Sequence, residues 1–82
     1  MAAESIRLRL FGSLAQLAGW QILDWPWPDQ EVAPTPEQIW FGLGLSVALD
    51  DLRIAVNLEF ASLNQPLRPG DEVAFLPPLS GG

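Results

Sequence analysis

The 82-residue chain contains no cysteine, no histidine and no lysine. Without cysteine there can be neither disulfides nor thiolate metal sites, and without histidine the usual general base and the commonest metal ligand are missing. Without lysine no Schiff base can form on a side chain. Glycine-rich phosphate loops and Ser-His-Asp sets are absent as well. We therefore expect no metal site, no directly bound cofactor and no catalytic activity from this chain alone.

Positive charge is also scarce, because four arginines face ten acidic residues and the net charge is −6. Nucleic acid requires a basic face, so we expect no nucleic-acid partner. An acidic protein of this size suits a basic protein partner, since opposite charges speed the encounter, although acidity can also serve solubility alone. No run approaches 18 apolar residues and no signal pattern precedes the first strand, so we expect a cytoplasmic protein without a membrane partner.

The chain is long enough for one small domain, and its first part predicts a strand followed by a short helix. Residues 5–11 alternate, which is typical of a half-buried strand. Three apolar residues share its core face: Ile6, Leu8 and Leu10. The other face carries Arg7, Arg9 and Phe11. After Gly12, Ser13 and Gln16 form a capping-box pattern for a helix that ends at Gly19. Its apolar stripe would be Leu14, Leu17 and Ala18.

The middle of the chain predicts an edge strand and a second helix. Residues 21–27 form the strand candidate, which Pro26 and Pro28 shorten or confine to an edge. Thr35-Pro36-Glu37-Gln38 supplies an N-cap, a proline at the first helical position and a capping-box glutamine. The helix should bury three apolar side chains: Ile39, Trp40 and Leu43. It should end between residues 42 and 44, where two glycines occur.

The last part predicts two more strands. Residues 54–60 alternate with Ile54, Val56 and Leu58 inward. On this pattern Phe60 would point inward too, unless a bulge or strand end intervenes. A type II turn at residues 68–71 then leads into a strand from Glu72 to Phe75, flanked by Asp71 and Leu76. Its inward residues would be Val73 and Phe75, and its outward residues Ala74 and Leu76.

The final six residues predict an extended arm. Pro77 and Pro78 lack N–H donors, so no sheet ladder can continue through them. The arm could reach about 20 Å at roughly 3.3 Å per residue. Gly81 and Gly82 have no side chain, so their backbone could pass through a narrow channel in another protein. We therefore divide the chain into a domain, residues 1–76, and an arm, residues 77–82.

Two stretches carry a resemblance to a known family. Residues 55–82 read AVNLEFASLNQPLRPGDEVAFLPPLSGG and look like the C-terminal half of the small subunit of molybdopterin synthase, a sulfur carrier. Residues 8–19, LRLFGSLAQLAG, resemble that family's first strand and helix. The resemblance implies an α+β fold of the β-grasp, ubiquitin-like type. Such a fold has a mixed sheet of four to five strands, helices packed on one face and a flexible C-terminal Gly-Gly arm.

The resemblance also implies a chemistry for the arm. A terminal carboxylate is ionised at neutral pH and is a poor electrophile, so a partner must activate it. In the family, an adenylyltransferase similar to ubiquitin-activating enzymes uses ATP to adenylate the last glycine, and a sulfur donor protein converts it to a thiocarboxylate. Gly82 matches that position and Gly81 its neighbour. Residues that match the inserted tail are Pro77, Pro78, Leu79 and Ser80. The resemblance implies that the tail enters the large subunit of molybdopterin synthase, in a heterotetramer.

A docking surface is predicted beside the arm. Alternation places Phe11 and Leu76 on the non-core side of their strands, where large apolar groups serve no folding purpose. The family's docking patch maps onto Phe11, Phe60 and Leu76, and an exposed apolar cluster is what a docking site requires. The competing interpretation is that these three side chains complete a small core.

Other functions fit the same arm. The sulfur could be delivered to thiamine, cysteine or transfer-RNA thiolation instead of molybdopterin. Alternatively, the protein could be a ubiquitin-like modifier that is joined to lysines of its targets. The weakest alternative is an interaction module whose tail is inert.

Overall fold

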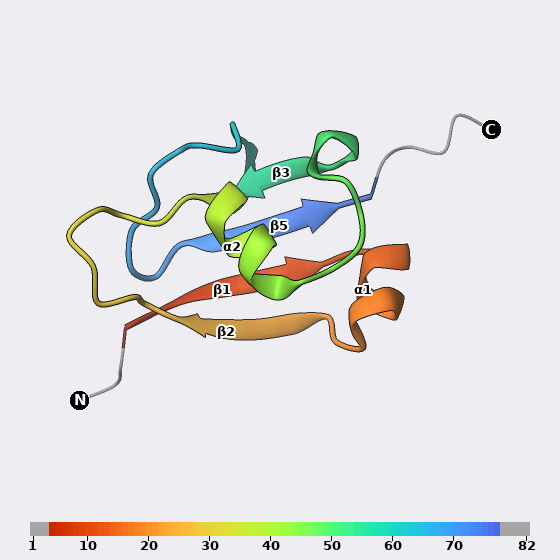
Figure 1. Ribbon diagram of the computed structural model, residues 1–82, viewed down its shortest axis with the longest axis horizontal. Helices are drawn as coiled ribbons and strands as arrows, with labels where there is room; N and C mark the ends of the chain where they lie inside the picture. The colour runs from red at the N-terminus through yellow and green to blue at the C-terminus, as the bar shows by residue number, and fades with distance from the viewer. Residues whose placement is uncertain (1–3, 78–82) are drawn as a thin grey trace.

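The computed structural model describes residues 4–77, which form a mixed β-sheet with two α-helices (Figure 1). The elements in chain order are β1 (Ser5–Leu10), α1 (Ser13–Ala18), β2 (Ile22–Pro26), α2 (Pro36–Leu43), the 3₁₀ turn η1 (Leu49–Asp51), β3 (Arg53–Val56), β4 (Glu59–Phe60) and β5 (Glu72–Leu76).

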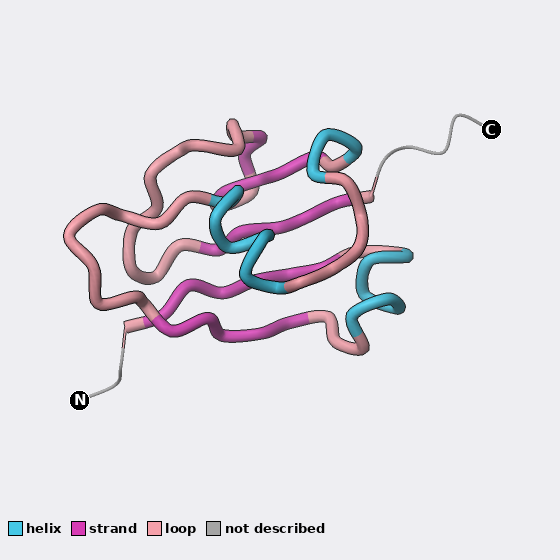
Figure 2. The backbone as a smooth tube through the Cα atoms, viewed as in Figure 1, coloured by secondary structure: helices cyan, strands magenta, loops and turns pink. Residues whose placement is uncertain are grey.

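The sheet has the strand order β2-β1-β5-β3-β4, so the last strand in sequence lies at its centre. β1 and β5 run parallel, whereas the β1–β2, β3–β5 and β3–β4 pairs are antiparallel. α2 lies across one face of this sheet, and α1 lies at the end where β1 and β5 finish (Figures 1 and 2). This arrangement confirms the predicted β-grasp fold, and β2 is an edge strand as its prolines predicted.

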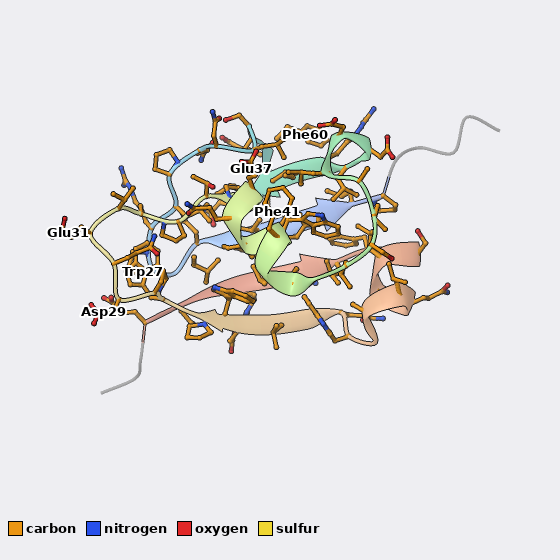
Figure 3. The ribbon with its side chains drawn as sticks, viewed as in Figure 1. Trp27, Asp29, Glu31, Glu37, Phe41 and Phe60 are labelled. Atoms are coloured by element: carbon orange, nitrogen blue, oxygen red, sulfur yellow. The ribbon has the colours of Figure 1, made fainter. Side chains whose placement is uncertain are left out.

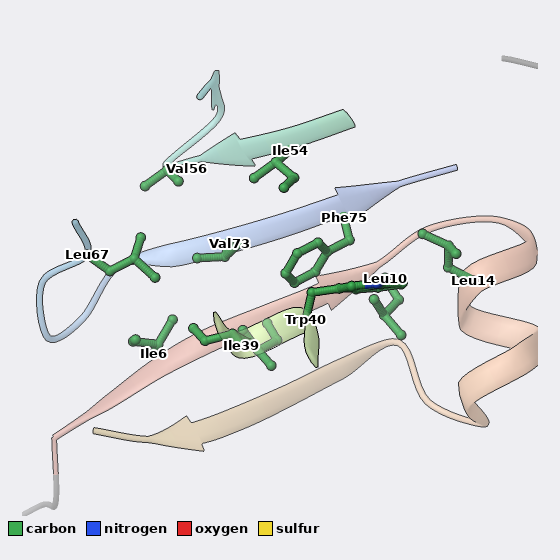
Figure 4. Packing of buried hydrophobic residues seen from close by; sticks show 11 residues of the cluster. Ile6, Leu10, Leu14, Ile39, Trp40, Ile54, Val56, Leu67, Val73 and Phe75 are labelled. Atoms are coloured by element: carbon green, nitrogen blue, oxygen red, sulfur yellow. The ribbon is translucent and has the colours of Figure 1, made fainter. Parts of the chain in front are cut away.

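The core lies between the sheet and α2 (Figure 4). It contains the residues of β1, β3 and β5 that alternation placed inward, and also Leu67, which the sequence pattern did not indicate. The buried hydrophobic side chains are Ile6, Leu8, Leu10, Leu14, Ile39, Trp40, Ile54, Val56, Leu67, Val73 and Phe75. The rings of Trp40 and Phe75 pack with their centroids 5.0 Å apart. The indole N–H of Trp40 donates a hydrogen bond to the carbonyl of Val47 at 3.2 Å, which satisfies its polar atom.

The second helix begins and ends as predicted. The Thr35 hydroxyl accepts a hydrogen bond from the Gln38 amide at 3.3 Å, and the Gln38 side chain accepts one from the Thr35 amide at 3.2 Å. These two bonds complete the capping box, with Pro36 at the first helical position. Gly44 closes the helix in the left-handed conformation at φ 71°.

The first helix corrects two predictions. Ser13 is its first helical residue and makes no capping hydrogen bond, because the N-cap is Gly12, which has no side chain to supply one. Leu17 is 51% exposed and does not belong to the apolar stripe. The helix is only six residues long and lies at the end of the sheet, so the core reaches only the side that carries Leu14, Ala15 and Ala18.

The predicted strand over residues 54–60 is also wrong in its second half. Asn57 and Leu58 both have positive φ, 52° and 71°, as in the type I′ turn of a two-residue hairpin. The chain therefore reverses between β3 and β4, and Leu58 is 86% exposed rather than inward. Asn57 stabilises the turn, since its side chain donates to Asp71 and accepts from the Glu72 amide, both at 3.0 Å.

Candidate docking surface and arm

The arm leaves the sheet from its central strand. The predicted turn precedes that strand, with the Asp71 amide donating to the Arg68 carbonyl at 3.1 Å and Gly70 at φ 89°, as a type II turn requires. At the other end of β5, Pro77 lies beside Gly12, where an added Cβ would be only 3.3 Å from the proline ring. The predicted arm residues Pro78, Leu79, Ser80, Gly81 and Gly82 lie outside the described residues.

The sheet face opposite α2, here called the open face, carries two of the predicted docking residues next to the start of the arm. Phe11 follows β1, its amide donates to the Phe75 carbonyl at 3.3 Å, and its side chain is 41% exposed. Leu76 ends β5 and is half-buried opposite Arg53 of β3. The alternation argument is therefore confirmed for both residues, because neither belongs to the buried core.

Phe60 joins the same face because of the tight turn between β3 and β4. It pairs with Ala55, which alternates with the buried Ile54 and Val56 and so points to the open face. Phe60 is 73% exposed at the β4 edge of the sheet (Figure 3). By parity alone Phe60 would have pointed inward. The turn at residues 57–58 ends β3 before Phe60 and so places Phe60 on the open face.

Arginine side chains accompany the two phenylalanines, a feature that the docking prediction did not contain. The guanidinium carbon of Arg9 lies 5.7 Å from the Phe11 ring centroid, and that of Arg53 lies 5.9 Å from the Phe60 ring centroid. Both distances suit cation–π attraction. The Arg9–Phe11 pair was visible in the sequence as a two-residue spacing on one strand. The Arg53–Phe60 pair was not, because the hairpin turn creates it.

No catalytic cluster emerges from residues 4–77. Within this part of the chain no polar or charged side chain is buried, and no three potential metal-ligating residues gather. None of the helices in the same residues is long and apolar enough to cross a membrane. The arm and the open face are therefore the features from which a function can be argued.

Solved structures with the same fold define the class of this protein as β-grasp, ubiquitin-like. The SAMP1 structure from Haloferax volcanii superposes with a TM-score of 0.73 at 26% identity, over 95% of this chain and 99% of that one. A putative molybdopterin converting factor subunit 1 from Pyrococcus furiosus gives a TM-score of 0.74 at 22% identity, over 94% and 100%. Urm1 from Trypanosoma brucei gives 0.70 at 20% identity, over the full length of both chains.

Within that class, the chain belongs to the ThiS family, whose sequence pattern matches residues 8–82. It is also 51% identical over 39 residues to the molybdopterin synthase sulfur carrier subunit of Escherichia coli. That alignment covers 45% of this chain and 48% of the curated relative, so the match spans about half the length of each protein.

Proposed function

We propose that this protein is the sulfur carrier of molybdenum cofactor biosynthesis and acts as the small subunit of molybdopterin synthase. The observation that carries the proposal is the placement of Pro77. The central strand β5 ends there, next to Phe11 and Leu76 on the open face. A partner that docks on this face would meet the beginning of the arm. Membership of the ThiS family and the partial match to the Escherichia coli subunit support the same assignment.

The proposed chemistry takes place at the carboxylate of Gly82 and is performed by partners. A carboxylate oxygen attacks the α-phosphorus of ATP in an adenylyltransferase of the ubiquitin-activating type, pyrophosphate leaves, and an acyl adenylate results. A sulfide equivalent from a sulfur donor protein then attacks the carbonyl carbon and expels AMP, which leaves a thiocarboxylate. The large subunit receives the arm and passes this sulfur to a pterin precursor, with two charged carriers consumed for each dithiolene.

The proposal is tested by deleting Gly82 and assaying dithiolene formation with the purified large subunit, the adenylyltransferase, ATP and a sulfur donor. Sulfur transfer should be lost. The melting temperature should remain unchanged, because every residue of the buried core precedes the arm in the sequence, from Ile6 to Phe75. Deletion of Ala2, to which no role is assigned, is the matched control and should retain full activity. Dithiolene formation by the chain without Gly82 would contradict the proposal.

A second candidate function is protein modification, which is favoured by the structural similarity to SAMP1, named as a small archaeal modifier protein. In this case a target lysine would attack the Gly82 adenylate, or a thioester formed from it, to give an isopeptide bond. The chain has no lysine, so it could not form polymers through its own side chains. A covalent adduct on lysines of other proteins, observed after incubation with ATP and the activating enzyme, would favour this candidate.

A further inference from the structure

The charges of this acidic protein are unevenly distributed over its surface. Three of its four arginines, Arg7, Arg9 and Arg53, alternate with buried residues and point to the open face. Only two of its ten acidic residues lie among them, and both are paired: Asp24 with Arg7 at 3.6 Å and Glu72 with Arg9 at 3.7 Å. The other eight acidic residues and Arg68 lie outside the open face. The open face is therefore locally cationic on a chain of net charge −6.

Two of these arginines lie over aromatic rings. Arg9 lies over Phe11 on the β1 side of β5, and Arg53 lies over Phe60 on the β3–β4 side. A guanidinium within about 6 Å of a ring centroid is attracted to the ring, and this attraction favours the positions in which Arg9 and Arg53 lie on the open face. The Arg9–Glu72 distance of 3.7 Å is longer than a hydrogen bond, so this ion pair does not engage the Arg9 donors fully.

Small side chains separate the two Arg–Phe pairs. In the sheet register, Arg9 is opposite Ala74, Ala74 is opposite Ala55, and Ala55 is opposite Phe60. One row across the open face therefore reads arginine, alanine, alanine, phenylalanine. The next row toward the arm contains Leu76 opposite Arg53. A strip of small and apolar residues thus runs between the pairs and ends at Pro77, where the arm begins.

We propose that this strip binds an acidic segment of the acceptor subunit that the arm enters, a segment with apolar side chains over the alanines and carboxylates facing Arg9 and Arg53. This inference rests on the proposed function and adds the chemistry of the partner. Guanidinium groups bind carboxylates with two parallel hydrogen bonds, which fixes orientation as well as adding affinity. A basic partner would instead be attracted to the acidic remainder of the molecule, away from the arm.

The experiment measures binding of the full chain to the purified large subunit by calorimetry at low salt. The double variant Arg9→Gln/Arg53→Gln should bind about tenfold or more weakly than the unmodified chain, as expected when interfacial charge pairs are lost. Arg68→Gln removes one positive charge before the start of β5, far from the arm, and should change the affinity less than about twofold, whereas Arg9→Gln or Arg53→Gln alone, each also a loss of one charge, should weaken binding more. Arg53→Lys keeps the charge but loses the planar guanidinium that can pair with a carboxylate through two hydrogen bonds, and should give an intermediate loss.

The salt dependence provides an independent readout that a purely structural role of the arginines would not affect. Raising sodium chloride from about 0.05 to about 0.5 M should lower the affinity of the unmodified chain for the large subunit more than that of the double variant. The reason is that salt screens the attraction between the arginines and the carboxylates, which the double variant has already lost. Equal affinities of the two at low salt, with unchanged melting temperatures, would overturn this inference alone. Failure of the unmodified chain to bind the large subunit at all would overturn the proposed function together with it.

Discussion

At the scale of single residues, the phenylalanines of this protein have two distinct roles. Phe75 is completely buried and packs against Trp40, with ring centroids 5.0 Å apart. Phe60 is 73% exposed and Phe11 is 41% exposed, each beneath an arginine. The difference follows from strand position and parity, since Phe75 lies on the helix-covered side of the central strand and Phe60 lies on the opposite side at an edge. Loss of the ring should therefore affect folding in the first case and binding in the second.

Phe75→Ala should lower the free energy of unfolding by about 3–5 kcal/mol, the range for aromatic truncation in a core. Phe60→Ala should lower it by at most about 1 kcal/mol, which corresponds to an exposed cation–π contact. The measurement is urea denaturation monitored by tryptophan fluorescence. A loss of several kcal/mol for Phe60→Ala would assign that residue to the core instead of the docking surface.

Gly12 is the residue at which the start of the arm and the start of α1 meet. Its φ of 56° and ψ of −131° resemble the first central position of a type II′ turn, which glycine dominates. Gly12→Ala should destabilise the protein by about 1–3 kcal/mol, because the strained backbone and the close Pro77 ring both oppose a methyl group. Gly19→Ala is the control and should cost about 1 kcal/mol, since Gly19 has φ 83° and open space around it. Thermal unfolding of both variants would compare them, and equal losses would argue against the Pro77 contact.

At the scale of elements, the two helices begin with similar sequence signals and different structures. Thr35 and Gln38 form the complete capping box of α2, whereas Ser13 of α1 makes no capping bond. The second signal includes a proline at the first helical position and is followed by residues that bury against the sheet. The first follows a glycine that takes the cap position itself. A capping-box sequence pattern therefore needs its serine or threonine to be the N-cap residue itself, with an extended backbone. Thr35 meets this condition with φ −119° and ψ 161°.

Thr35→Ala should destabilise the protein by about 1 kcal/mol, because the Gln38 amide loses its acceptor at the helix start. Ser13→Ala removes a hydroxyl that caps nothing and should change the stability by no more than about 0.5 kcal/mol. Both values can be obtained from chemical denaturation of the single variants. Equal effects of the two substitutions would show that the capping geometry does not contribute to stability.

Local sequence patterns predicted most of the helices and strands, and failed where contacts with distant parts of the chain determine the conformation. The alternation in β1 and β5 identified the core residues and placed Phe11 and Leu76 on the other face. The type II turn before β5 was also predicted, because Pro69 and Gly70 determine it locally. The strand over residues 54–60 was not, since Leu58 carries no turn signal and adopts positive φ only within the hairpin stabilised by Asn57 and Asp71. The position of Phe60 consequently followed from family resemblance and not from its parity.

At the scale of the whole molecule, the net charge does not describe how charge is distributed over the surface. The value of −6 suggested a basic partner, yet three arginines lie on the open face, two of them, Arg9 and Arg53, toward the end of β5 where the arm begins. Arg9 and Arg53 are far apart in sequence and share a surface only because β1 and β3 flank β5. No composition or periodicity contains that information. The strand order is what turns a scarce residue type into a local cationic surface.

Whether Gly82 carries sulfur can be determined by fragment mass spectrometry. The chain is incubated with ATP, the activating enzyme and a sulfur donor, and its C-terminal fragments are then analysed. Fragments are required because oxidation of Met1 or a tryptophan adds nearly the same mass as replacing oxygen by sulfur. We expect a mass gain localised at Gly82 that disappears when the large subunit and pterin precursor are added. A Gly82 fragment that never gains mass under these conditions would contradict it.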